Sequence, residues 1–468
     1  MRRAAASRRR STRSRAVPVL LVVTLVVLLT ALWREAGSRQ PMSSVDEHMH
    51  LDTHAHVHDG TYPHRGSLMT MEVVREWACG VGHEAGDAMA PCEHPDLGPN
   101  SLPSGIYTSG YIHYPTYFVL AEGYRSAAEA VGGGGSFVTP YRHFAALVAG
   151  SGILLCLLAG WRLGFRGARL LAATFAPSAA AGILLYGTIA NPQSSAVLTG
   201  ALIAWSGLRW VLGGHGFWWF AAATALAASL AVVQSLPAGV FMVAMVATLV
   251  LRRLGWTVPG PWRPRWWQLG LLTVIVVTPV VAYGRWLESR ATIPNSELYG
   301  FASFDGLADV VRGALWELSI LHTPWYESVS LGADPQAPLV QHASRAAVQG
   351  VPLWMTLAVF APLAVVAGRA VLRARAASTP EDRTRTVEIV PLLVVSAFVT
   401  LVLFPPALRV SNAFNVGFDY PVVSRYAISF VPVLVWLVLL AAPGRPVLGR
   451  VLATLGTVGV LGVGLAIW

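Results

Sequence analysis

Long apolar runs recur along this chain and are separated by short polar segments. Windows long enough to cross a hydrocarbon core of about 30 Å lie at 17–33, 144–163, 170–190, 193–212, 217–235, 236–251, 267–286, 351–371, 388–408, 426–442 and 449–467. A run of this length and hydrophobicity is typical of a membrane-spanning helix. The pattern therefore predicts an all-α integral membrane protein with about 11 transmembrane helices.

Two of the segments between these windows are too long to be simple turns. The chain therefore divides into five parts: a basic N-terminus with the first span (1–33), an external loop (34–143), spans two to seven (144–286), a second external loop (287–350) and spans eight to eleven (351–468). Long connections commonly carry binding and catalytic residues. We expect substrate handling in the two large loops.

Composition supports the membrane assignment and gives it an orientation. Hydrophobic residues make up 54% of the chain and charged residues only 12%, which excludes an ordinary soluble domain. The net charge of +10 comes entirely from arginines, most of which fall between spans on one side of the predicted topology. This bias predicts a cytoplasmic N-terminus and external large loops, and it explains the basic charge without a nucleic-acid partner. No small-residue cleavage site follows Trp33, so the first span is expected to be an uncleaved signal anchor.

Two adjacent acids, Asp46 and Glu47, follow the first span closely. Carboxylates at a membrane surface can act as a general base or hold a metal ion. Ordinary solvated acids of a loop are the alternative, because adjacent acids are common.

Five histidines follow the acid pair: His48, His50, His54, His56 and His58. In a helix His50, His54 and His58 share one face, and in a strand all five line one side. Either arrangement could bind a divalent metal ion, which is therefore a candidate cofactor. A polar, partly protonated surface is the other interpretation.

The same loop contains two further features. Cys79 and Cys92 both lie on the predicted external, oxidising side, which predicts a disulfide between them. Near the end of the loop, the aromatic-rich run at 110–131 predicts a helix that lies in the lipid headgroup layer.

Four short motifs carry a resemblance to a known family. The segment at 46–50 (DEHMH) resembles the D-E-x-x-H signature in the first external loop of a bacterial family of uncharacterised polytopic membrane proteins. That family is similar to the GT-C glycosyltransferases. The segment at 113–117 (HYPTY) resembles its H-x-P-x-Y element, Asn191-Pro192 resembles its Asn-rich turn, and the segment at 424–426 (SRY) resembles its late G-R-Y motif, with Ser424 in place of the usual glycine.

The resemblance implies a GT-C-like architecture and an inverting sugar transfer at the outer membrane face. A sugar would pass from a polyprenyl phosphate to a hydroxyl of an envelope glycan or lipid, in the plasma membrane. It further implies roles for particular residues: Asp46 and Glu47 in catalysis, Arg425 and Tyr426 in binding the donor phosphate, and His50, His113 and Tyr117 in binding substrate.

A non-enzymatic transporter or flippase of an envelope lipid is the alternative function. Transporters usually keep charged side chains or broken helices at the membrane midplane. Here the predicted spans contain almost no acids, and the ionisable residues gather in the external loops. The sequence therefore favours interfacial chemistry over passage through the membrane.

Overall fold

The structure is a computed structural model that describes most of the first two thirds of the chain and parts of the remainder. The described residues are 2–294 except 44–45, 83–91, 93, 103–104, 133–135, 181–185 and 257–260, followed by 297, 306, 308, 389, 391–396, 398–404, 407–408, 424–441 and 446–466. The predicted span at 351–371 and nearly all of the second large loop, 287–350, lie outside the described residues.

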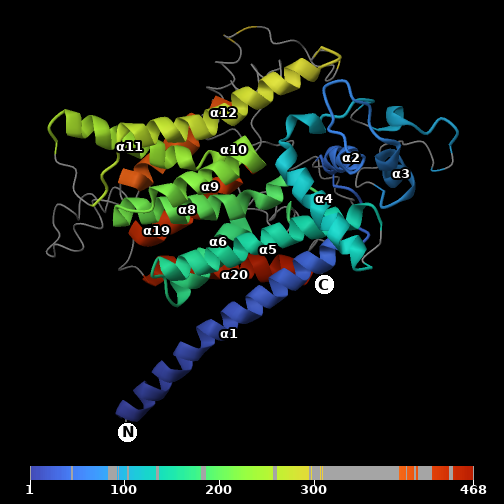
Figure 1. The fold of residues 1–468 in the computed structure, drawn as a ribbon. Coiled ribbons are helices and arrows are strands. Elements are labelled where there is room, and N and C mark those ends of the chain that lie inside the picture. The colour runs from blue at the N-terminus through green and yellow to red at the C-terminus, as the bar shows by residue number, and fades with distance from the viewer. Residues whose placement is uncertain are drawn as a thin grey trace.

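The fold is all-α, as the sequence predicted, and consists of a long bundle with a smaller helical unit at one end (Figure 1). The bundle helices are α1 (Arg2–Ala36), α5 (Val138–Arg162), α6 (Ala168–Ala180), α8 (Ala196–Gly213), α9 (Phe217–Leu230), α10 (Val232–Ser235), α11 (Ala238–Arg253), α12 (Trp266–Arg290), α19 (Val431–Ala441) and α20 (Pro446–Ala466). Shorter turns are η3 (Pro192–Ser195), η4 (Val399–Leu403) and η5 (Ser424–Phe430). Within the described ranges, the only β pairing is an isolated bridge between Leu68 and Tyr107.

Several of these helices are suited to a bilayer. Four described stretches are long and apolar enough to cross one: Ala16–Ala36, Val138–Arg162, Pro192–Gly213 and Trp266–Arg290. Shorter apolar helices occupy Phe217–Leu230, Tyr426–Ala441 and Val447–Gly462. The chain is thus a multi-pass membrane protein. The total of about 11 spans stays a prediction.

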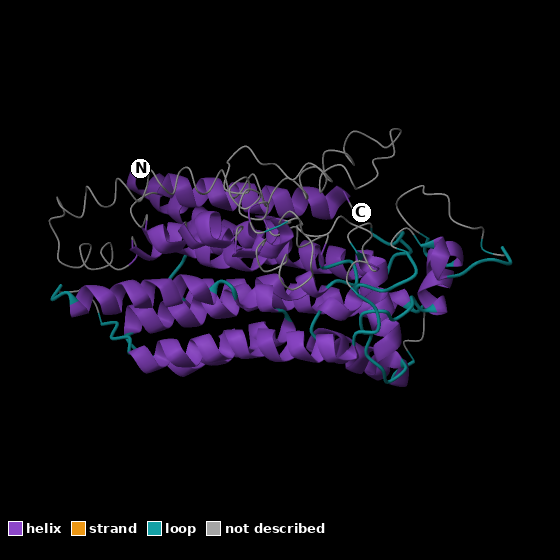
Figure 2. Ribbon diagram, turned by 90° about the horizontal axis from the view of Figure 1, so that it is seen from above, coloured by secondary structure: helices purple, strands orange, loops and turns teal. Residues whose placement is uncertain are grey.

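The segment predicted as the first external loop folds mainly into helices. It contains α2 (Glu47–His58), α3 (Met71–Cys79), η1 (Pro99–Ser101), η2 (Gly110–Ile112) and α4 (Pro115–Ala130), which we call the cap. The cap has its own apolar core, in which Leu51, Val74 and Phe118 are fully buried. Both views place it at one end of the bundle (Figures 1 and 2). A set of helices with a core can hold side chains in fixed positions, which a flexible loop cannot.

The cap contains two features that the sequence predicted, a disulfide and a helix in the aromatic run. Cys79 and Cys92 form a disulfide at its edge. Helix α4 falls within the aromatic run, buries Tyr117 and Phe118, and leaves Val119 and Leu120 about half exposed. This two-sided character fits a helix beside the membrane surface.

The helices in the windows at 217–235 and 236–251 are interrupted on both sides of α10, the short helix that contains Gln234. The backbone is extended at Ala231, and Pro237 precedes α11. Gln234 is 1% exposed and donates to the carbonyl oxygen of Pro192 at 2.9 Å, while Ser195 donates to its side-chain oxygen at 2.9 Å. Gln234 therefore does more than mark a turn, because it fastens α10 to the start of α8.

Close approach between bundle segments depends on glycine at particular positions. Gly200 on α8 faces η5, and a Cβ atom at this position would collide with the backbone carbonyl of Ser429. Gly456 on α20 similarly faces the backbone of Ala176 on α6, with an added Cβ only 2.6 Å from the amide nitrogen. Small residues at helix contacts are the usual means of close packing in a membrane.

Gly200→Ala is expected to destabilise the bundle by about 1–3 kcal/mol, because the added methyl group must push η5 away from α8. Gly270→Ala on α12 is the matched control, since an added Cβ there meets nothing within 4 Å. Thermal unfolding of the detergent-purified proteins measures both. Equal melting temperatures for the two variants would contradict close packing at Gly200.

Candidate functional site

A buried ion pair fixes the beginning of α2. Glu47 is 0% exposed and Arg142, on α5, is 1% exposed. The Nε atom of Arg142 donates to Oε1 of Glu47 at 2.7 Å, and Nη2 donates to Oε2 at 2.9 Å. This is a bidentate, charge-assisted contact with little competition from water.

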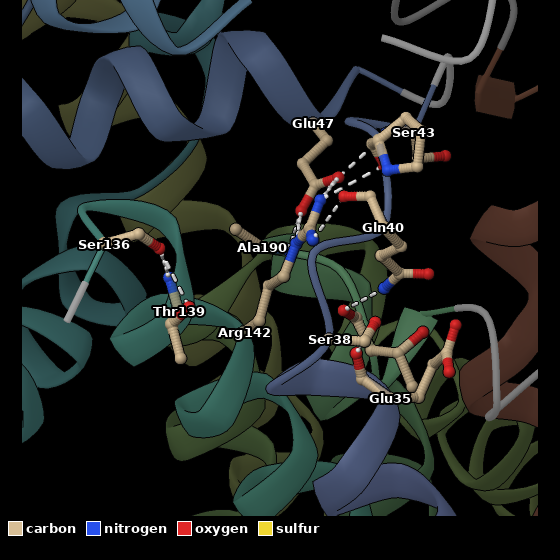
Figure 3. Close-up of polar contacts among 11 residues, drawn as sticks. Glu35, Ser38, Gln40, Ser43, Glu47, Ser136, Thr139, Arg142 and Ala190 are labelled. Atoms are coloured by element: carbon tan, nitrogen blue, oxygen red, sulfur yellow. Dashed lines mark hydrogen bonds and ion pairs between the residues drawn. The ribbon is translucent and has the colours of Figure 1, made fainter. Parts of the chain in front are cut away.

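Backbone groups complete the surroundings of both charges (Figure 3). The amides of Ser43 and Ala190 donate to the Glu47 carboxylate at 2.8 and 2.9 Å. The Arg142 guanidinium donates to the carbonyl oxygens of Gln40 and Pro41 at 2.9 and 3.3 Å. The pair therefore joins four separate segments: the chain after α1, the start of α2, helix α5 and the turn that leads into η3.

Sequence reasoning missed Arg142, which stands two residues before the predicted second span. An arginine at the edge of an apolar window needs a partner if it is not at the surface. That rule would have singled out Arg142 as a candidate, but it does not identify the acid. Glu47 lies 95 positions earlier, and only folding brings the two together.

Asp46 occupies the N-cap position of α2 in an unusual backbone conformation. Its φ of 58° and ψ of 16° are left-handed, and within the described part of the chain no other non-glycine residue has a positive φ. This conformation costs about 1–3 kcal/mol for most residues, although aspartate tolerates it better than most. The side chain makes no cap hydrogen bond and is partly exposed. Asp46 is thus held by its neighbour Glu47 and presents its carboxylate beside the helix end.

The histidines of α2 lie in different environments. His48 packs edge-on against Trp77, with ring centroids 5.0 Å apart. The His50 ring lies 4.6 Å from that of His113, which precedes α4.

His54 is fully enclosed by aromatic rings. It stacks on Tyr141 with centroids 4.0 Å apart and meets the edge of Phe118 at 4.8 Å. Neither ring nitrogen has a hydrogen-bond partner. Such an environment suits a neutral imidazole.

The three histidines predicted to bind a metal ion lie in different surroundings. Helix α2 does place His50, His54 and His58 on one face, but His58 bonds Glu122 at 3.0 Å near the surface while His54 lies among aromatic rings. Among the residues that the structure describes, no group of three His, Cys, Asp or Glu side chains could hold a metal ion. The contacts that these histidines make are ring packing and hydrogen bonds, and metal binding stays a prediction.

Burial controls the ionisation of the cap. Burial lowers the pKa of His54 to about 3, with a smaller contribution from nearby Arg125. Burial also lowers the pKa of His48 to about 4, although Asp46 and Glu47 oppose this shift. Asp52 is affected in the other direction, because burial raises its pKa against the hydrogen bond that it accepts from the Thr70 amide at 2.7 Å.

The H-x-P-x-Y segment connects the cap to the bundle. Tyr117 is buried, and its hydroxyl lies 3.1 Å from the Ser194 hydroxyl in η3. The carbonyl oxygen of His113 accepts hydrogen bonds from the hydroxyls of Tyr62 and Tyr283, the latter on α12. This segment therefore supports the junction between cap and bundle.

The remaining two motifs meet at the same junction. The Asn191 side chain accepts a hydrogen bond from the Gln193 amide at 2.9 Å and so caps η3. Turn η3 packs against η5, which begins with the segment at 424–426. Because Ala190 donates to Glu47 just before η3, all four motif segments gather at the end of the bundle that carries the cap.

Several residues that were predicted to contact substrate or take part in catalysis are buried in the structure. Glu47, His50 and Tyr117 are buried, and both oxygens of Glu47 are occupied by the contacts described above. In this structure the contacts of Glu47 position the start of α2, and the catalytic and substrate-binding roles of Glu47, His50 and Tyr117 stay predictions. Tyr426 is partly buried against the bundle core, and the backbone of Arg425 lies in η5, whereas its side chain is outside the described part.

Arg142→Gln is expected to destabilise the folded protein by about 3–5 kcal/mol, because it leaves the buried Glu47 carboxylate without its counter-charge. The double variant Glu47→Gln/Arg142→Gln should be less unstable than the sum of the single variants, since the two charges are coupled. Arg75→Gln, on the exposed side of α3, is the matched control and should change stability by less than about 0.5 kcal/mol. If Arg142→Gln and Arg75→Gln have the same melting temperature, the ion pair does not have this structural role.

The buried histidines predict that the protein loses stability in acid. Their pKa values in the folded state lie below the ordinary value of about 6.5, so the unfolded chain binds protons that the folded cap excludes. Their contribution to the free energy of unfolding is complete above about pH 7. It is lost as the pH falls from about 6.5 toward the folded-state pKa values, about 4 for His48 and about 3 for His54. The raised pKa of Asp52 acts in the opposite direction and reduces the net slope.

His54→Phe should lower this acid sensitivity, because phenylalanine fits an aromatic environment and takes up no proton. The measurement compares melting temperatures at about pH 5 and about pH 7.5. His215→Phe, at an exposed turn on the far end of the bundle, should leave the pH dependence of the parent unchanged. An unaltered dependence in His54→Phe would mean that other groups determine it.

Comparison with known proteins adds one structural likeness. No family model matches the chain, and a search of curated proteins finds no match. Among solved structures, the chain is similar to the crystal structure of ArnT from Cupriavidus metallidurans bound to undecaprenyl phosphate. The two are 15% identical with a TM-score of 0.34, over 95% of this chain and 77% of that one.

Proposed function

We propose that this protein is a membrane glycosyltransferase that moves a sugar from a polyprenyl-phosphate donor to a hydroxyl of an envelope glycan or lipid. The observation that carries the proposal is the placement of Asp46. A partly exposed carboxylate stands at the helix end in a left-handed conformation, and a buried ion pair on the next residue fixes that helix end. Strained, over-determined backbone of this kind is often associated with functional residues.

In the proposed reaction Asp46 is the general base. Its carboxylate takes the proton of the acceptor hydroxyl as the acceptor oxygen forms a bond to the anomeric carbon of the sugar. The bond from that carbon to the phosphate oxygen breaks at the same time, and the polyprenyl phosphate leaves with the electron pair. Attack from the face opposite the phosphate inverts the anomeric configuration.

Glu47 and Arg142 have a different task in this proposal. The two side chains neutralise each other, and both oxygens of the Glu47 carboxylate already accept hydrogen bonds from Arg142 and from backbone amides. They keep the N-terminus of α2 and therefore Asp46 in place. Precise placement of a base contributes to catalysis because the reacting groups need little reorganisation.

The donor phosphate requires a positive partner, and Arg425 is the proposed one. A guanidinium can bind two phosphate oxygens at once. Its segment packs beside η3, which follows directly after the backbone amide bonded to Glu47. Tyr426 is proposed to contact the same donor.

The proposed orientation places the cap outside the plasma membrane and the N-terminus in the cytoplasm. The arginine bias of the short connections supports this direction. An external disulfide between Cys79 and Cys92 is consistent with it.

Asp46→Asn is expected to reduce sugar transfer by about 10²–10⁴-fold, because the amide cannot accept the proton. Folding should be retained, since asparagine adopts the left-handed conformation readily. The assay follows radiolabelled sugar from polyprenyl phosphate into acceptor in membranes that contain the protein. Asp46→Gly should show the same loss, as glycine preserves the backbone and removes the carboxylate.

Asp59→Asn provides the control at the other end of α2, where the carboxylate is exposed. It should keep the activity of the parent. Full activity of Asp46→Asn would remove Asp46 from the chemistry. If the parent transfers no sugar but moves a labelled lipid across vesicles, the transporter function would replace the enzymatic one.

A further inference from the structure

The end of the bundle opposite the cap is rich in arginine and tryptophan. Here α5, α8 and α11 end and α9 and α12 begin, and both views place these helix ends away from the cap (Figures 1 and 2). Ring contacts link several of them, including Trp210 with Phe217 at 5.2 Å and Phe217 with Trp267 at 5.2 Å. We call residues 161–169, 205–219, 250–256 and 261–267 the arginine–tryptophan end.

Its tryptophans reach the surface. Trp218, Trp219 and Trp256 are 66%, 73% and 66% exposed, and Trp161, Trp266 and Trp267 are about half exposed. Tryptophans beside apolar helix ends are typical of the membrane–water interface, where the ring contacts acyl chains and the indole N–H contacts headgroups. The headgroup layer of the membrane is therefore the environment of these side chains.

Arginines lie directly over several of the rings. The guanidinium carbons of Arg162 and Arg166 are 5.6 and 5.5 Å from the centre of the Trp161 ring, and that of Arg253 is 5.7 Å from Trp266. Cation–π contacts hold a guanidinium without using its N–H groups. Arg166 also donates through Nη1 to the carbonyl oxygens of Trp161 and Phe165, each at 2.7 Å. An arginine held over a ring keeps its other donors for an anionic ligand and loses less side-chain freedom on binding.

The charge of this end has one sign. Its described residues include no aspartate or glutamate and eight arginines: Arg162, Arg166, Arg169, Arg209, Arg252, Arg253, Arg263 and Arg265. An end with positive charge, no acids and exposed tryptophans complements an anionic lipid surface. A neutral lipid surface has no net charge that would complement these arginines.

We propose that the arginine–tryptophan end binds the phosphate groups of anionic phospholipids in the membrane leaflet that it faces. Guanidinium groups over Trp161 and Trp266 donate to the phosphate oxygens, and the neighbouring indole rings lie against the glycerol and acyl regions. This lipid site is at the opposite end of the bundle from Asp46. The inference does not depend on the proposed sugar transfer.

The test measures lipid binding to the full-length protein in neutral detergent. Phosphatidylglycerol and phosphatidylcholine are titrated separately, and native mass spectrometry counts the bound lipids. The parent should prefer phosphatidylglycerol, and added salt should weaken that preference. Inorganic phosphate at the same concentration should not compete, because it lacks the acyl chains that the tryptophans contact.

Arg162→Gln/Arg253→Gln should weaken binding of phosphatidylglycerol by about fivefold for each arginine removed, or roughly 25-fold for the pair. Arg162→Lys/Arg253→Lys should keep most of the binding, since the charge is retained. The matched control is Arg39→Gln/Arg75→Gln, which removes two exposed arginines from the cap end of the chain and should bind as the parent does.

Three results would overturn the proposal. These are equal binding of the two lipids by the parent, unchanged binding by Arg162→Gln/Arg253→Gln, and an equal loss in the control pair. If the glutamine pair does not fold, a photoreactive phosphatidylglycerol on the parent decides the question. Crosslinks should fall in residues 161–169 and 250–267, and crosslinks only in the cap would reject the site.

Discussion

The ion pair between Glu47 and Arg142 is the interaction on which the arrangement of the cap depends. Two opposite charges that are almost inaccessible to water stabilise a fold only if each remaining donor and acceptor has a partner. Here four backbone groups supply those partners, at Gln40, Pro41, Ser43 and Ala190. The pair consequently fixes the direction in which the chain leaves α1 and the point at which α2 begins.

The left-handed conformation of Asp46 follows from this constraint. The amide of Ser43 donates to the side-chain carboxylate of Glu47, the first residue of α2, so the chain turns at Asp46 to bring that carboxylate back to Ser43. Aspartate adopts this left-handed conformation at lower cost than most residues, and its carboxylate is partly exposed beside the helix end. Glu47, which fixes the start of α2, is thus adjacent to Asp46, the proposed general base.

The two ends of the bundle have opposite characters. The cap end carries acids, histidines and a disulfide, and its polar groups are held by a network of hydrogen bonds. The other end carries arginines over tryptophan rings and no described acid. A membrane protein with such ends has a defined orientation, because the anionic leaflet and the aqueous surface interact with different groups.

The sequence by itself determined the all-α class, most helix positions and the position of the acid pair, because these depend on local hydrophobicity and spacing. It also predicted the pairing of Cys79 with Cys92, which are only 13 residues apart. Tertiary structure decided which polar residues are buried. Arg142 meets Glu47 across 95 positions, and His54 is enclosed by rings from α4 and α5. Such contacts depend on how helices pack, and no local pattern in the chain specifies that.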